Sequence, residues 1–141
     1  LGSLLGRTIG RPSERNTRMF FSKFIVAHID RMPQELIALE TLHSRRHRRS
    51  ITGLFRAGLT PRGFRPRYVL RDRLRQLQVP ATFLWSERDP FKTIEEARAV
   101  AALVPGARFV MIPDAGHLPC TDQPELTATL LERALADANA P

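Results

Sequence analysis

The sequence predicts an α/β protein whose last half runs strand, helix, strand, helix, with the two strands parallel. Residues 79–85 and 108–112 are short runs of apolar, β-branched and aromatic residues, the composition of strands in a buried parallel sheet. A helical pattern separates them, and a crossover of that length makes the two strands parallel. A second helical pattern follows residue 117.

The first of these helices is marked at both ends. Thr93 and Glu96 have the spacing of a capping box, in which the hydroxyl accepts a backbone N–H and the carboxylate reaches back. Pro105 and Gly106 end the helix. Its apolar positions recur at helical spacing: Ile94, Ala97, Val100, Ala101 and Val104.

The last helix is predicted to begin at Asp122, with Pro124 and Glu125 in its first turn. One apolar stripe follows, made of Leu126, Leu130, Leu131, Ala134 and Leu135.

The first half of the chain shows helical patterns and no clear strand between residues 12 and 66. We expect three short helices. The first follows Ser13 and carries the apolar residues between positions 19 and 29, the second begins at Pro33 and reaches about residue 42, and the third carries Ile51, Leu54 and Phe55 and stops near residues 58–61. A linking helix over residues 68–77 then leads to the first strand.

Two loops carry the residues of greatest chemical interest. Asp89 lies in the turn after residues 79–85, and His117 follows Gly116 in the loop after residues 108–112. Both come just past the carboxyl end of a predicted strand, where α/β sheets build their sites. Adjacent parallel strands lie about 4.8 Å apart, so the two side chains can meet.

The run from residue 79 to about residue 135 resembles the end of an α/β-hydrolase fold enzyme. The shared features are V-P-x-x-x-x-W, a small residue and x-x-D, then a helix, A-R-x-x-x-x-P-x-A-G-H-x-P and D-x-P-E. Ser86 stands where that family usually has glycine. The resemblance implies that Asp89 is the acid and His117 the base of a catalytic triad.

The chemistry of the two residue types agrees with this assignment. A neutral imidazole can take a proton from a nucleophile and return it to a leaving group. A carboxylate on the other ring nitrogen fixes the tautomer and stabilises the imidazolium. Asp114 and Glu87 are alternative acids, although we expect Asp114 to stabilise its own turn.

The nucleophile of this family sits in a G-x-S-x-G elbow, and no such elbow occurs in the 141 residues. We therefore interpret the chain as a C-terminal fragment, with a helical lid over residues 1–66 and part of the hydrolase core over residues 67–141. We expect the fragment to be inactive without the N-terminal core of the same protein.

The resemblance implies a hydrolase acting on a small apolar ester or related bond, with no cofactor or metal. The nucleophile stays open, because esterases, lactonases, carbon-carbon bond hydrolases, haloperoxidases, dehalogenases and epoxide hydrolases share this tail. In the family the lid selects the substrate. Phe20, Phe21, Phe24, Leu54 and Phe55 are therefore candidate pocket walls, with packing of the lid on the core as the alternative.

Composition sets further bounds. No apolar run approaches the roughly 20 residues of a membrane span, and one cysteine, Cys120, rules out an internal disulfide, so the expected location is the cytoplasm. We expect Cys120 to be a small buried residue, with a place in the pocket lining as the alternative. His43 and His47 lack the glutamate of H-E-x-x-H, so no zinc site is predicted.

The chain is strongly basic, with 22 Lys and Arg against 14 Asp and Glu and a net charge of +8. Residues 45–49, Arg-Arg-His-Arg-Arg, form a dense basic run. Interleaved aromatic residues for base stacking are missing, so we interpret the run as a solvated helix face. A basic nucleic-acid-binding module and a noncatalytic interaction scaffold remain the alternatives. The binding-module alternative requires that Asp89 and His117 do not meet.

Overall fold

The computed structural model describes residues 12–60 and 63–138 and, for residues 48–52 and 54–56, the backbone alone. The chain divides into two compact units. Residues 21–32 join residues 71–141 in one unit, and residues 33–70 join the residues up to Phe20 in the other.

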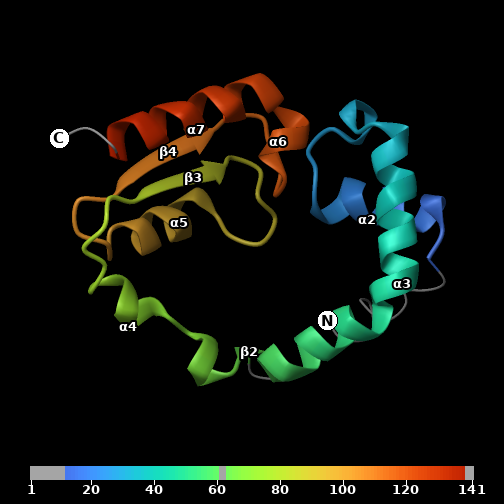
Figure 1. The fold of residues 1–141 in the computed structure, drawn as a ribbon, viewed down its shortest axis with the longest axis horizontal. Coiled ribbons are helices and arrows are strands. Elements are labelled where there is room, and N and C mark those ends of the chain that lie inside the picture. The colour runs from blue at the N-terminus through green and yellow to red at the C-terminus, as the bar shows by residue number, and fades with distance from the viewer. Residues whose placement is uncertain (1–11, 61–62, 139–141) are drawn as a thin grey trace. The chain divides into compact units, whose positions relative to one another are not determined.

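The second unit contains the predicted strand, helix, strand, helix order. Strands β3 (Thr82–Ser86) and β4 (Arg108–Ile112) pair in parallel. Helix α5 (Ile94–Ala101) connects them, and helices α6 (Pro119–Asp122) and α7 (Pro124–Ala138) follow. In Figure 1 the strand pair lies between α5 and α7. The prediction of a parallel α/β unit is confirmed.

Helix α5 begins as its sequence predicts. The backbone N–H of Glu96 donates to the Thr93 hydroxyl at 3.2 Å, and that of Thr93 donates to the Glu96 carboxylate at 3.0 Å. Both bonds of the capping box are therefore formed, and they satisfy two of the backbone donors that a helix start leaves unpaired.

The core of the second unit lies where α5 packs on the strand pair. Its buried apolar residues include Ala97, Ala101, Val104, Ile112 and Ala115. Residues 82–85 are only half-buried, which differs from the buried strand expected. A sheet of two strands leaves more of each strand exposed than a sheet of the usual four to six strands does.

Two other helices differ from the prediction. The last helix is divided into α6 and α7 at Gln123, so Asp122 ends the short helix rather than beginning the long one. The predicted linking helix over residues 68–77 is reduced to a 3₁₀ turn, η2 (Pro66–Tyr68), and one turn of helix, α4 (Arg71–Leu74).

One helix of the first unit is longer than predicted. Helix α3 (Gln34–Gly58) is continuous over 25 residues, so the expected division into two helices is wrong. No glycine or proline interrupts residues 43–52, and the basic run continues the helix. Strands β1 (Leu59–Thr60) and β2 (Gly63–Phe64) form a small antiparallel pair, too short to show an alternating pattern.

Helix α2 (Glu14–Phe24) ends earlier than the apolar pattern suggests. The pattern continues to Ile29, yet residues 25–28 are an irregular segment that leads into the 3₁₀ turn η1 (Ile29–Arg31). The backbone N–H groups of Ala27 and His28 bond to the Asp122 side chain instead of continuing the helix. A tertiary contact thus overrides the local helical pattern.

Candidate active site

The acid loop begins where β3 ends at Ser86. The Asp89 side chain is only 6% exposed, and both of its oxygens are used. Oδ1 accepts the backbone N–H of Phe91 at 2.7 Å, and Oδ2 lies 2.9 Å from Nδ1 of His117. The loop therefore holds the carboxylate in one orientation.

The histidine loop begins at the same edge of the sheet. Ser86 and Ile112, the last residues of the two strands, are register partners. The backbone N–H of Glu87 donates to the Ile112 carbonyl, and that of Arg88 to the Ala115 carbonyl, each at 2.9 Å. These bonds join the two loops and bring together the two residues that the sequence selected.

The hydrogen bond to Asp89 orients the His117 ring. When Nδ1 donates to Asp89, the neutral ring leaves Nε2 unprotonated, as a general base requires. The side chain is 47% exposed, and Nε2 has no hydrogen bond to any described residue. Phe91 contacts the imidazole edge to face, with ring centroids 4.7 Å apart. The polar and ring contacts of the imidazole with described residues are therefore those to Asp89 and Phe91.

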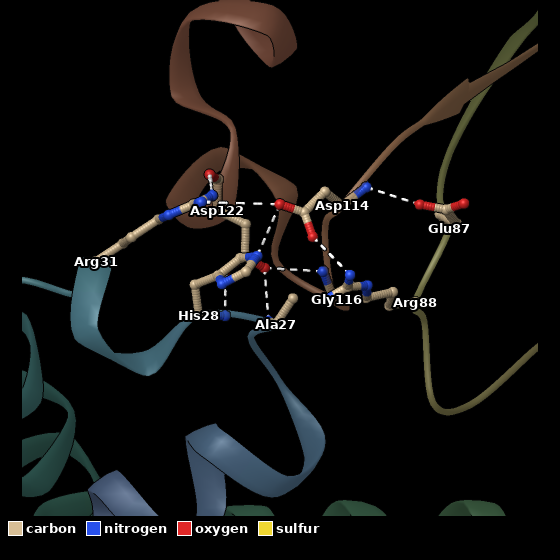
Figure 2. Close-up of polar contacts among 8 residues, drawn as sticks. All are labelled: Ala27, His28, Arg31, Glu87, Arg88, Asp114, Gly116 and Asp122. Carbon is tan, nitrogen blue, oxygen red and sulfur yellow. Dashed lines mark hydrogen bonds and ion pairs between the residues drawn. The ribbon is translucent and has the colours of Figure 1, made fainter.

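The alternative acids have other partners. The Glu87 carboxylate accepts the backbone N–H of Asp114 at 2.9 Å. The Asp114 carboxylate bonds His28 Nε2 and Arg88, each at 2.9 Å, and lies 3.7 Å from Arg31 (Figure 2). Asp114 thus contacts more than its own turn, and Asp89 is the carboxylate that bonds His117.

The backbone and the charge of Asp114 are both unusual. Its φ angle of 51° lies in the left-handed region, which Asp tolerates better than most residues. The hydrogen bond from His28 lowers the pKa of Asp114 below its ordinary value, with further lowering by the charges of Arg88, His28 and Arg31. Partial desolvation opposes this shift.

Asp122 contributes a contact that the sequence reasoning did not identify. Its side chain is buried and accepts backbone N–H groups from Ala27, His28 and Gly116 (Figure 2). The pattern around Asp122 is that of a helix start, and nothing in it indicates partners almost 100 positions earlier.

The candidate pocket residues lie on two helices, α2 and α3. Phe20 and Phe24 lie on α2, on either side of the boundary between the two units, and both are half-buried. Leu54 and Phe55 are on α3, but their side chains lie outside the described residues. Cys120 is exposed on α6, so the expectation that it is buried is wrong.

Comparison with known proteins identifies the family. The model of the alpha/beta hydrolase family matches residues 3–130, most of the chain. The chain belongs to this family, in agreement with the resemblance of its acid and histidine loops. No curated protein matches it.

Two solved structures agree on the fold, and a third matches a shorter part of the chain. A serine hydrolase involved in carbazole degradation has a TM-score of 0.67 at 16% identity, over 88% of this chain and 47% of its own. A membrane phospholipase A, a bacterial virulence factor, has a TM-score of 0.66 at 18% identity, over 92% and 40%. An esterase from Thermogutta terrifontis is 35% identical over 50% of this chain and 26% of its own, with a TM-score of 0.49. The chain spans less than half the length of each.

The described residues show two further features. No group of three or more His, Cys, Asp or Glu side chains among residues 12–60 and 63–138 is arranged to hold a metal ion. Within the same residues, no helix has the length and apolar character needed to cross a membrane.

Proposed function

We propose that this chain supplies the acid and the base of a nucleophile-His-Asp triad in a hydrolase that cleaves a small apolar ester or related bond. The observation that supports the proposal is the 2.9 Å hydrogen bond between His117 Nδ1 and Asp89 Oδ2 at the ends of two paired parallel strands. Membership of the alpha/beta hydrolase family points the same way.

In the proposed mechanism, Nε2 of His117 removes the proton of a nucleophile supplied from outside the 141 residues. The imidazolium formed is stabilised by the Asp89 carboxylate, and Nε2 then protonates the leaving group. Phe91 keeps the ring plane in place between the two transfers. The proposal uses no metal or cofactor.

The proposal also assigns roles to the two parts of the chain and to a partner. Residues 1–66 would form the lid and residues 67–141 part of the core. Phe20, Phe24, Leu54 and Phe55 would contact the substrate. The N-terminal core of the same protein would be the partner that completes the site. The protein would be located in the cytoplasm.

The binding-module alternative is not favoured by the geometry. That hypothesis requires Asp89 and His117 to lie apart, and they are hydrogen-bonded. Arg45, Arg46 and His47 are exposed on α3, as a solvated helix face requires, while the side chains of Arg48 and Arg49 lie outside the described residues.

The test is hydrolysis of short-chain p-nitrophenyl esters by the 141-residue chain and by a longer polypeptide translated from the same reading frame. We expect no saturable hydrolysis by the short chain. We expect turnover by the longer one, with a loss of kcat of about 10³-fold or more in His117→Ala and about 10²-fold or more in Asp89→Asn. Asp30→Asn, an exposed change in η1, is the control.

Saturable hydrolysis by the 141 residues alone would refute the external nucleophile. A longer polypeptide that hydrolyses esters equally well with His117→Ala would refute the triad.

A further inference from the structure

The His117 ring has one hydrogen-bond partner and one aromatic partner among the described residues. Almost half of its side-chain surface is exposed, and its described ring contacts are with Asp89 and Phe91. The position of the ring also depends on the backbone that carries it. The groups that fix the backbone around His117 therefore determine whether the ring meets Asp89.

The Asp122 carboxylate is the most buried polar group close to that backbone. The residue is 2% exposed. Oδ2 accepts the N–H groups of Ala27 and Gly116, each at 2.8 Å, and Oδ1 accepts that of His28 at 2.9 Å (Figure 2). A buried carboxylate is tolerated when charge-assisted hydrogen bonds replace its lost water.

These bonds fasten the residues on both sides of His117 to the same segment. Gly116 directly precedes His117 and shares Oδ2 of Asp122 with Ala27. Leu118 directly follows His117, and its N–H donates to the Ile25 carbonyl at 3.0 Å. We call residues 25–28 the strap.

A further bond fixes the turn that carries Asp122 itself. Arg31 donates to the Asp122 backbone carbonyl at 2.9 Å. All the groups involved belong to the second unit. The strap, the histidine loop and α6 are therefore connected around one carboxylate.

We propose that Asp122 is a positioning residue for His117: its carboxylate binds the peptide N–H of Gly116 and the strap together and so keeps His117 Nδ1 directed at Asp89. The proposed consequence for catalysis rests on the proposed function. The positional effect does not, because it can be observed in this chain without substrate.

The test is nuclear magnetic resonance on the 141-residue chain carrying Asp122→Asn. Asparagine has the same shape, but its NH2 group cannot accept an N–H, so at least one of the three bonds is lost and the others lose the charge of the carboxylate. We expect the amides of Ala27, His28 and Gly116 to exchange about tenfold faster or more, since a net hydrogen bond to a charged group exceeds the 1.4 kcal/mol that corresponds to tenfold. We also expect the fraction of neutral His117 protonated at Nδ1 to fall.

Asp114→Asn is the matched control. Asp114 lies in the same loop, but its carboxylate bonds the side chains of His28, Arg31 and Arg88 and no peptide N–H of the loop. Protection of the Gly116 amide and the His117 tautomer should not change in this variant. Asp89→Asn is the positive control for loss of the tautomer. The amides of β3 and β4 report whether each variant is folded.

Two results would overturn the proposal. If the three amides lose protection while the His117 tautomer is unchanged, Asp122 only stabilises the strap. If the amides keep their protection, the carboxylate does not hold the strap and the loop together.

If Asp122→Asn does not fold, the unchanged protein provides the measurement. Hydrogen exchange at increasing urea should then show Ala27, His28 and Gly116 opening together, with the His117 Nδ1 proton exchanging in the same event. Independent opening of Gly116 would overturn the proposal. Failure of ester hydrolysis in the longer polypeptide would refute the proposed function and leave these measurements unaffected.

Discussion

A Cβ atom on Gly116 would lie 2.7 Å from the backbone nitrogen of Ala27. It would also lie 2.8 Å from the carbonyl carbon of Val26 and 2.9 Å from the carbonyl oxygen of Ile25. All three are backbone atoms, which cannot rotate away as a side chain can. The strap passes so close to the histidine loop that only glycine fits at this position.

We expect Gly116→Ala to lower the free energy of unfolding by about 1–3 kcal/mol, the usual cost of overpacking. Urea unfolding followed by the fluorescence of Trp85 measures this loss, because Trp85 is the one tryptophan of the chain and lies in the second unit with Gly116. Gly53→Ala in α3 is the control, because nothing lies within 4 Å of the added Cβ. This control variant should raise the free energy of unfolding by about 0.5–1 kcal/mol. Urea unfolding followed by circular dichroism measures the change. Equal losses in the two variants would contradict this account of Gly116.

The capping box of α5 gives a second prediction. Thr93→Ala removes the acceptor of the Glu96 N–H and should lower the free energy of unfolding by about 1 kcal/mol. Thr93→Ser keeps the hydroxyl and should remain within about 0.5 kcal/mol of the unchanged protein. Thermal unfolding of both variants measures the difference. If serine destabilises as much as alanine, the hydroxyl bond is not the cause.

The parts of the fold that could be predicted are those determined by short-range patterns. The capping box of Thr93 and Glu96, the two apolar strands and the positions of Asp89 and His117 after them all depend on neighbours in the sequence. Because parallel strands end at the same edge, the contact between those two residues followed from the strands. The family resemblance was confirmed by the match over residues 3–130.

The parts that could not be predicted depend on partners distant in the sequence. The early end of α2 is set by Asp122, nearly 100 residues later, which takes the N–H groups of Ala27 and His28. The pairing of His28 with Asp114 is equally remote. Neither leaves a periodic pattern. The length of α3 was missed because its apolar positions are interrupted by the basic run, although nothing there breaks a helix.

The first unit has a buried hydroxyl pair that also allows a test. Thr17 of α2 and Thr41 of α3 lie with their hydroxyl oxygens 2.7 Å apart. Because Thr41 donates its proton to the Ile37 carbonyl, Thr17 is the donor between the two. Thr41→Val leaves the Thr17 hydroxyl buried without its acceptor, which should cost about 1–3 kcal/mol.

The double variant is the control for that prediction. Replacing both residues with valine removes donor and acceptor together, and the loss should be smaller than that of Thr41→Val alone. Urea unfolding of the two single variants and the double variant completes the cycle. Losses that simply add would show that the hydroxyls do not depend on each other.

The cluster around Asp114 should make stability depend on pH in the acid range. A carboxyl group whose pKa is lower in the folded than in the unfolded state stabilises the fold above its unfolded pKa, about 3.9. Asp114 is such a group, because His28 bonds it and Arg88 and Arg31 lie beside it. Its stabilisation is lost as the pH falls through the lower, folded-state pKa.

We therefore expect Asp114→Asn to lower the urea midpoint at about pH 6, where the carboxylate is charged, and to have progressively less effect below about pH 4. Salt should also reduce the effect, since the side chain is 36% exposed and its partners Arg31 and Arg88 are more so. Asp30→Asn is the matched control, an exposed aspartate of the same unit with no ion pair among the described residues. The urea midpoints of Asp114→Asn and of the unchanged protein could instead differ by the same amount from pH 6 to the acid limit. That result would show that His28 and the arginines do not stabilise the ionised carboxylate.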